Sequence, residues 1–392
     1  MPVNKEVVFD IIKASLWSQK SDGLTFTEEI RTELCKQSVD GLSIVVNHEN
    51  VKEKYLRAAR FAQMLTVQTS VINIIQQSGI SVVVLKGTSA GIYYPFPFLR
   101  KYGDIDLLVH PNNYTKTIEI LKENGYVHSG EIGKNVTTFR KNGYQIEIHQ
   151  RPPGLSRVKE GSFIQNYLIT GLDKIEYASI SQPKNTFPML PWQQNGLELI
   201  WHIREHLYNG LGLRQVIDWM MFVYKCLDSD ESFREYSEIL KNAGLEELAI
   251  TVTRMCQLYL GLDNDITWCK DVDPEICREL MEYILDQGNF GIKREDDKTV
   301  KALTRYRNPF SFFVAMQKKG LAEWNPAKKC VLLKPFAWTY ICIEGIHRYT
   351  GQRGVQQFLL DLKENNRRRK LFDNLYDDEL EGRIGISQSR TR

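Results

Sequence analysis

Apolar residues recur along the chain at spacings that predict helical regions towards both ends and a sheet between them. Over Val51–Gln77 they return mostly every three or four residues, the spacing of a helix with one buried face, and Gly79 is a suitable stop. We therefore expect residues 1–79 to be helical. A similar apolar stripe returns in residues 186–380, which are also predicted to be mainly helical. Residues 381–392 are rich in Gly, Ser and Arg, a composition typical of disorder.

Residues 80–185 carry shorter patterns that are typical of strands. The pair Asn142-Gly143 lies between two strand-like runs and is a strong signal for a hairpin. The patterns predict strands at 81–85, 104–109, 126–129, 136–140 and 144–149. They also predict a short helix at 89–94, which the prolines that follow break, and a helix at 114–123 that Asn-Gly closes. The predicted fold class is therefore α+β, with a small mixed β-sheet core flanked by N-terminal and C-terminal helical regions.

Composition narrows the class of protein. The 392 residues include 51 basic and 48 acidic ones, interspersed, for a net charge of +3. This balance predicts no surface for a long nucleic acid, although it allows a local basic pocket for a triphosphate. The seven cysteines form no CxxC pair, which argues against a disulfide framework and a thiolate zinc site. No segment has the length and apolar character of a signal peptide or a membrane span, so we expect a cytoplasmic protein that does not bind membranes.

The stretch Gly-Asp-Ile-Asp-Leu-Leu-Val holds the most informative pair of residues. Residues two apart in a strand point to the same face, so the carboxylates of Asp104 and Asp106 project together. Such a pair repels unless a cation lies between its members, and oxygen ligands favour Mg²⁺ or Mn²⁺. Metals held in this way serve phosphoryl or nucleotidyl transfer. The apolar residues that follow favour this reading over a solvated edge strand or a turn.

A third carboxylate, that of Glu147, alternates with Ile146 and Ile148 in a predicted strand. These neighbours fix its orientation, and we assign it as the third metal ligand, although a lone Glu in a strand is usually solvated. His149 is expected to support Glu147 through a hydrogen bond rather than to bind the metal.

The stretch Val-Leu-Lys-Gly-Thr-Ser, at the end of the first predicted strand, predicts a phosphate-binding turn. A strand that ends in Lys-Gly and leads into a short helix presents main-chain N–H groups, and Gly87 lets the main chain approach a ligand closely. Thr88 and Ser89 supply hydroxyl groups. Lys86 and Arg100 are candidate cations for a triphosphate, although Lys86 can instead cap the strand and Arg100 can pair with a surface acid. The P-loop pattern is absent.

Taken in order, these motifs resemble a known family. Leu-Lys-Gly, Tyr-Tyr-Pro, Leu-Arg, Gly-Asp-Ile-Asp-Leu-Leu-Val, Asn-Gly-Tyr and Ile-Glu-Ile-His follow one another as in the large, poorly characterised nucleotidyltransferase family of the polymerase-β-like superfamily. The resemblance covers Val82–His149 closely and extends loosely to His202–His206 and Arg214–Asp218. Two features differ from the superfamily pattern: Lys-Gly-Thr-Ser replaces the usual Gly-Ser turn, and 17 positions separate Gly87 from Asp104.

The resemblance implies a role for each matching residue. The phosphate-binding turn is implied to consist of Gly87, Thr88 and Ser89, and the metal ligands are implied to be Asp104, Asp106 and Glu147. A second group, which lines a possible substrate pocket, consists of His149, His206, Arg214 and Asp218. His202 and His206 lie four apart on one helix face, but the Glu of a HExxH zinc motif is not in its place between them.

These observations predict a Mg²⁺-dependent nucleotidyltransferase, with Mn²⁺ as the other suitable metal. It is expected to transfer NMP from an NTP to an unidentified small-molecule or protein acceptor and to release pyrophosphate. Two alternatives remain open. One is a catalytically inactive module on the same fold that binds a nucleotide or a partner. The other is a phosphotransferase that passes on the γ-phosphate and releases NDP.

Overall fold

The computed structural model of the chain describes residues 5–18, 24, 26–46, 51–132, 135–155, 158–181, 183–207, 210–263 and 265–288, and short stretches between 313 and 375. The chain divides into two compact units. The first comprises residues 1–156 and 160–292, and the second comprises residues 157–159 and 293–392. The predicted division at residues 79, 185 and 380 remains a prediction, and the tail 381–392 lies outside the described residues.

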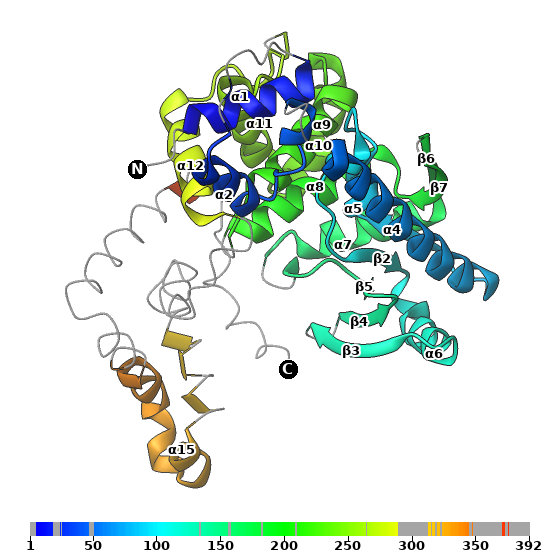
Figure 1. Cartoon of the computed structure of the whole chain (residues 1–392). Helices are drawn as coiled ribbons and strands as arrows, with labels where there is room; N and C mark the ends of the chain where they lie inside the picture. Colours follow the sequence, from blue (N-terminus) through cyan, green and yellow to red (C-terminus); the bar gives the residue numbers. More distant parts are fainter. Residues whose placement is uncertain are drawn as a thin grey trace. The chain divides into compact units, whose positions relative to one another are not determined.

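Helices make up most of the first unit (Figure 1). The helices that precede or accompany the first strands are α1 (Lys5–Trp17), α2 (Glu28–Lys36), α3 (Ser43–Val46), α4 (Val51–Gln77), α5 (Gly87–Gly91), η1 (Pro97–Leu99), η2 (Pro111–Asn113) and α6 (Tyr114–Glu123). Those that follow are α7 (Gly161–Thr170), η4 (Gly171–Asp173), α8 (Trp192–Leu207), α9 (Leu213–Cys226), α10 (Asp230–Asn242), α11 (Glu246–Leu260) and α12 (Pro274–Gln287). The predicted helix at 114–123 is confirmed as α6, and Gly125 at φ +73° ends it.

Within the described residues, seven strands form one mixed sheet in the order β3-β4-β5-β2-β1-β7-β6. The strands are β1 (Val82–Leu85), β2 (Ile105–Val109), β3 (Val127–Ile132), β4 (Val136–Lys141), β5 (Tyr144–His149), β6 (Glu176–Ser181) and β7 (Lys184–Met189). The neighbours β2–β5 and β1–β7 are parallel, and the other pairs are antiparallel. The predicted hairpin is confirmed as β4–β5, where Asn142 and Gly143 have φ +51° and +81°. The mixed sheet with its helices confirms the predicted fold class.

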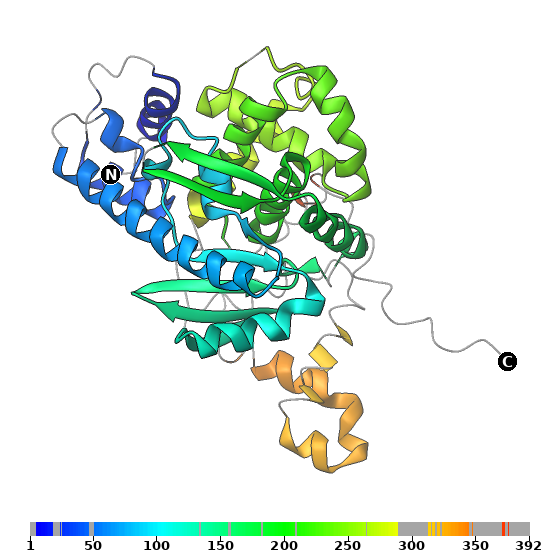
Figure 2. The ribbon, with the colours of Figure 1, turned by 90° about the vertical axis from the view of Figure 1, so that its right-hand side faces the viewer.

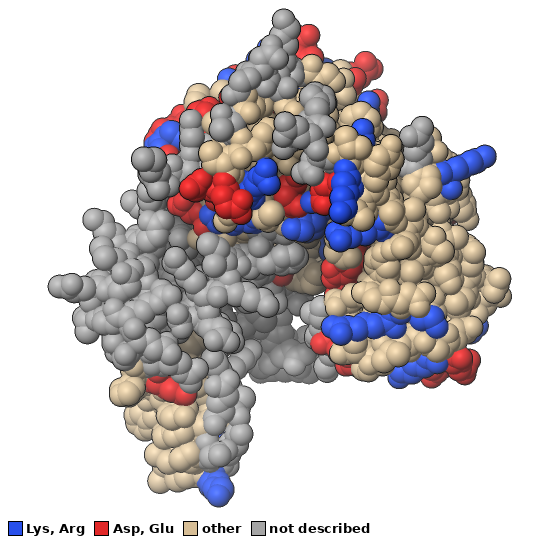
Figure 3. All heavy atoms as spheres, in the orientation of Figure 1, with Lys and Arg blue, Asp and Glu red and all other residues tan. Residues whose placement is uncertain are grey.

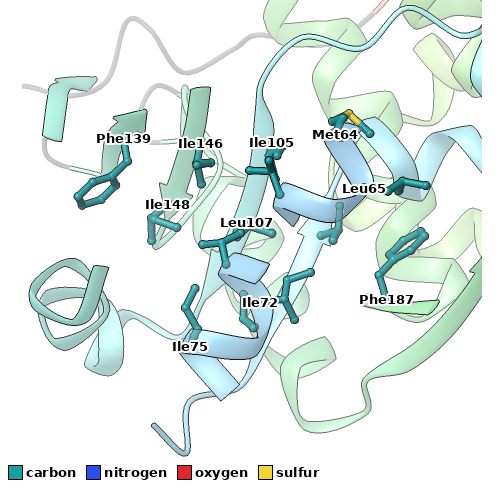
Figure 4. Packing of buried hydrophobic residues seen from close by; sticks show 14 of the residues in the cluster. Met64, Leu65, Ile72, Ile75, Ile105, Leu107, Phe139, Ile146, Ile148 and Phe187 are labelled. Atoms are coloured by element: carbon teal, nitrogen blue, oxygen red, sulfur yellow. The ribbon is translucent and has the colours of Figure 1, made fainter. Parts of the chain in front are cut away.

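Helix α4 covers one face of the sheet, as Figure 2 shows. Its apolar stripe, which includes Leu65, Ile72 and Ile75, packs against Ile105 and Leu107 of β2 (Figure 4). The alternate residues of the strands point to the other face. This alternation leaves the carboxylate-bearing positions of β2 and β5 on the face opposite α4.

The hairpin β6–β7 was missed by the sequence patterns. Pro188 lies within β7, and Pro is usually excluded from a strand inside a sheet because it lacks an N–H donor. The strand is tolerated here because β7 pairs with β1 at a single position, Val84 with Met189. Residue 188 therefore does not have to donate to β1.

In the second unit the described residues include α15 (Asn325–Lys329) and η6 (Val331–Phe336). The rings of Trp324 and Tyr340 stack there, with centroids 5.4 Å apart. Across the part of the chain that the structure describes, no helix combines the length and the apolar character needed to cross a membrane.

Candidate active site

Two neighbouring strands bring the predicted metal ligands together. Strand β2 lies parallel to β5, and Asp106 stands directly opposite Glu147 in their register. Asp104 immediately precedes β2 and lies two residues before Asp106, so both point towards the same face. The pairing is possible because the β4–β5 hairpin returns β5 to the centre of the sheet.

Two further side chains of β5 connect the acids. The Nε2 of His149 lies 2.9 Å from Oδ1 of Asp106 and 3.5 Å from Oε2 of Glu147. Gln145 donates from Nε2 to Oε1 of Glu147 at 2.9 Å and to Oδ2 of Asp104 at 3.4 Å. One ligand atom each from Asp106, Glu147 and His149 lies within 4.8 Å of the others, close enough to hold a single ion. This group includes His149, which was expected only to support Glu147, and it does not include the predicted ligand Asp104. Gln145 was not among the predicted residues, although its position two before Glu147 puts it on the same face.

The carboxylates differ in their electrostatic environment. Burial, reinforced by the negative charges of Asp106 and Glu147, raises the pKa of Asp104 to about 6. Burial acts in the same direction on Asp106, but Lys86 and the hydrogen bond from His149 outweigh it and hold the pKa of Asp106 below its ordinary value. The pKa of His149 is raised, because its hydrogen bonds to Asp106 and Glu147 outweigh its burial. The negative charges of these carboxylates therefore repel one another, and a bound cation would reduce this repulsion.

Lys86 ends β1 in a conformation that L-residues rarely adopt, with φ +47° and ψ −149°. Gly87 follows with φ +47°, and a Cβ atom there would meet nothing within 4 Å. The turn therefore leaves open space beside its main chain. The hydroxyl groups of the next two residues point elsewhere: Thr88 donates to Oε1 of Gln68 at 2.8 Å, and Ser89 donates to the carbonyl of Lys86 at 2.8 Å.

Arg100 and Asp218, predicted as separate site residues, pair with each other. The Nε and Nη2 atoms of Arg100 each donate to one oxygen of Asp218 at 2.7 Å, and Tyr94 donates to the same carboxylate at 2.8 Å. Both partners are almost completely buried. Arg214, four residues before Asp218 on α9, donates from Nη1 to the carbonyl of Lys101 at 3.3 Å. These contacts hold the loop before β2 against α9.

Helix α8 carries polar residues on one side at four-residue steps, from Glu198 through His202 to His206. The rings of the two histidines meet edge to face with centroids 4.5 Å apart. Burial and the nearby charge of Lys86 lower the pKa of His206 to about 4 and hold the pKa of His202 well below its ordinary value. Both rings are therefore neutral near pH 7. Glu198 was not predicted; its signal was an acidic residue within the apolar stripe of this helix.

A pocket of about 210 Å³ joins these elements. It is lined by Lys86, Gly87, Arg100, Gly103, Asp104, Asp106, Val136, Glu147, His149, Pro153, His202, His206 and Arg214. Three predicted residues, Thr88, Ser89 and Asp218, do not line it. Figure 3 shows acidic and basic side chains next to one another on the face drawn there, without a continuous stripe of either sign.

Comparison with known proteins decides the family. The model of a family described as "Uncharacterised nucleotidyltransferase" matches residues 32–261, more than half of the chain. The chain belongs to this family. The segment matched by the nucleotidyltransferase family contains every residue that lines the pocket.

Two solved structures resemble this chain distantly. The antibiotic-resistance factor ANT(2'')-Ia has a TM-score of 0.33 and 9% sequence identity, over 46% of this chain and 92% of that chain. An antigenic nucleotidyltransferase-like protein from Paracoccidioides brasiliensis has a TM-score of 0.31 and 11% identity, over 51% of this chain and 92% of that chain. A comparison with curated proteins finds no match.

Proposed function

We propose that the protein transfers NMP from an NTP to an acceptor with release of pyrophosphate, in a reaction that depends on Mg²⁺ or Mn²⁺. The observation that carries this proposal is the convergence of Asp104, Asp106 and Glu147 at one pocket that Lys86 also lines. Carboxylate oxygens from the β2 segment and from β5 are ligands that suit a hard divalent cation. The raised pKa of Asp104 is consistent with a site whose negative charge favours binding of such a cation.

Each residue has a proposed part in this reaction. Asp104, Asp106 and Glu147 would hold the metal, which when bound activates the acceptor and stabilises charge on the phosphates. Gln145 and His149 fix the orientation of these carboxylates. Glu147 would either take up the proton that the acceptor loses or serve only as one of the metal ligands.

The phosphates are proposed to lie along Lys86 and the main chain of Gly87, where the turn borders open space. Thr88 would contribute through its main-chain N–H, because its hydroxyl group is engaged with Gln68. Ser89 would instead hold the turn in shape, because its main-chain N–H and its hydroxyl both donate to the carbonyl of Lys86. Arg100 acts mainly by fixing the loop before β2, since Asp218 takes two of its donors. His149, His206 and Arg214 remain the proposed wall of the acceptor pocket.

The cellular setting is proposed on similar grounds. The seven cysteines are free thiols, which suits the reducing cytoplasm. The balanced charge suits a nucleotide and a small or protein acceptor better than a long nucleic acid.

One assay tests the reaction. The full chain is incubated with Mg²⁺ and each of labelled ATP, CTP, GTP and UTP, alone and with candidate acceptors, and the small products are identified. We expect pyrophosphate. Release of NDP would instead support a phosphotransferase, and binding without any product would support an inactive nucleotide-binding module. The variant Asp104→Asn is the matched control, since product that forms at this site should fall steeply in it and product that comes from a contaminant should not.

A further inference from the structure

Glu198 is a buried acid on α8 that has no part in the proposed reaction. Its side chain is 0% exposed, and it does not line the pocket. Neither carboxylate oxygen accepts a hydrogen bond from any of the described residues. Burial raises the pKa of Glu198, and the nearby charge of Lys86 opposes this rise. A buried carboxylate with so few partners is unfavourable, so an acid in this position calls for a specific reason.

The cation paired with Glu198 is Lys86, whose Nζ lies 3.6 Å from Oε1 of Glu198. Lys86 itself lines the pocket and keeps 12% of its side chain exposed. Its ammonium group also feels the charges of Asp106, Glu147 and Asp104, and Asp106 is the strongest of these. The ammonium group is thus attracted to the metal-binding acids on one side and to Glu198 of α8 on another. The unusual backbone conformation of Lys86 sets the direction in which its side chain leaves the main chain.

We propose that Glu198 is a positioning residue, which holds the ammonium group of Lys86 away from the metal-binding carboxylates and beside the path of the phosphates. This inference rests on the proposed function of the site. Without the charge of Glu198, the ammonium group would move towards Asp106, where it would neutralise the acids and compete with the divalent cation. Glu198 therefore allows Lys86 and the metal to serve the same pocket without excluding each other.

The test measures binding of Mn²⁺ alone to the full chain by electron paramagnetic resonance, with no nucleotide present. Glu198→Gln keeps the shape of the side chain and removes its charge. We expect the dissociation constant for Mn²⁺ to rise roughly tenfold in this variant. Lys86→Met removes the competing cation and should bind Mn²⁺ at least as tightly as the wild type. In the Lys86→Met background Glu198 loses its counter-charge and becomes protonated, so the added Glu198→Gln change should alter the constant by less than about twofold.

A structural role for Glu198 predicts a different result, namely the same loss of Mn²⁺ affinity with or without Lys86. That result, or unchanged affinity in Glu198→Gln, overturns the proposal. Tyr236→Phe is the control for disturbance of α8, because it removes a buried hydrogen bond to the carbonyl of Gln193 and changes no charge; its Mn²⁺ affinity should equal that of the wild type. If Glu198→Gln does not fold, Glu198→Asp replaces it, and a smaller weakening that disappears without Lys86 is expected.

The proposed function and the positioning role fail in distinguishable ways. A wild-type chain that binds no Mn²⁺ contradicts both. A wild-type chain that binds Mn²⁺ and releases pyrophosphate, beside a Glu198→Gln variant with unchanged Mn²⁺ affinity, contradicts only the positioning role.

Discussion

At the scale of single residues, Asp104 carries a charge that the fold makes unfavourable. Its pKa is about 6 in the folded chain against an ordinary value of 3.8, because of burial and its acidic neighbours Asp106 and Glu147. Between pH 4 and pH 6 the folded chain therefore binds more protons at this group than the unfolded chain does. The contribution of Asp104 to the free energy of unfolding must then decrease as pH rises through this window, and it is lowest above pH 6.

Asp104→Asn should separate this stability effect from the chemistry. We expect NMP transfer to fall by about a thousandfold or more, because a metal ligand is lost. In EDTA, the free energy of unfolding of the variant relative to the wild type should increase from pH 4 to pH 7. Urea denaturation at unit pH steps measures this difference. The exposed Asp173, changed to Asn, serves as the control for the loss of a carboxylate outside the site. A difference for Asp104→Asn that is flat across the same range would contradict the raised pKa.

Three residues of the candidate site could be predicted from short sequence patterns alone. Asp104 and Asp106 share a face because strands alternate, and Glu147 joins them because a hairpin signal lies just before its strand. The pairing of Arg100 with Asp218 spans 118 positions, and no local pattern encodes it. Glu198 looked like part of an ordinary helix, because its partner Lys86 lies far away in the sequence. The directions of the Thr88 and Ser89 hydroxyl groups likewise depend on packing rather than on spacing.

At the scale of elements, the buried pair of Arg100 and Asp218 fixes the loop that leads into β2 against α9. Two hydrogen bonds of 2.7 Å join them, and their side chains are only 3% and 2% exposed. Removing one member of such a pair leaves an uncompensated buried charge, which costs about 3–5 kcal/mol.

Asp218→Asn is therefore expected to lower the free energy of unfolding by an amount in this range, as measured by chemical denaturation. The double change Arg100→Met with Asp218→Leu removes both charges and should cost clearly less than the single change, because similarly sized apolar residues replace buried pairs at little cost. If the double variant is the less stable of the two, the loss in Asp218→Asn does not come from an uncompensated buried charge.

The elements that sequence patterns predicted well are those with a complete local signal. Helix α6 has the helical period and an Asn-Gly stop, and β5 has alternation beside a turn. Strand β7 had neither signal and contained a Pro, so its place beside β1 depended on the assembled sheet. Pairing between distant strands is a tertiary property, and propensity alone does not determine it.

At the scale of the whole molecule, the segment that matches the family is shorter than the segment that packs into one core. The match covers residues 32–261, yet α1 lies before it and α12 lies after it. Trp17 at the end of α1 donates from Nε1 to the carbonyl of Leu260 at 2.8 Å, and Gln37 donates to the carbonyl of Leu285 in α12 at 3.0 Å. Both outer helices are therefore part of the same helical layer as α11.

A chain that ends at residue 292 should keep this layer and the whole pocket, whereas residues 32–261 alone should not. In α1 the side chains of Val8, Ile11 and Ile12 are 0% exposed, and in α12 those of Leu280 and Ile284 are also 0% exposed. Each such side chain contributes about 1.5–3 kcal/mol through burial, so losing five of them removes an amount comparable with the whole stability of a typical domain, about 5–15 kcal/mol.

We expect residues 1–292 to unfold cooperatively on heating and to bind Mn²⁺ within about twofold of the full chain, because all the predicted ligands lie in the first unit. Residues 32–261 should show no cooperative transition by calorimetry. A cooperative transition in the shorter fragment would mean that the matched segment carries its own core and that the outer helices only cover it.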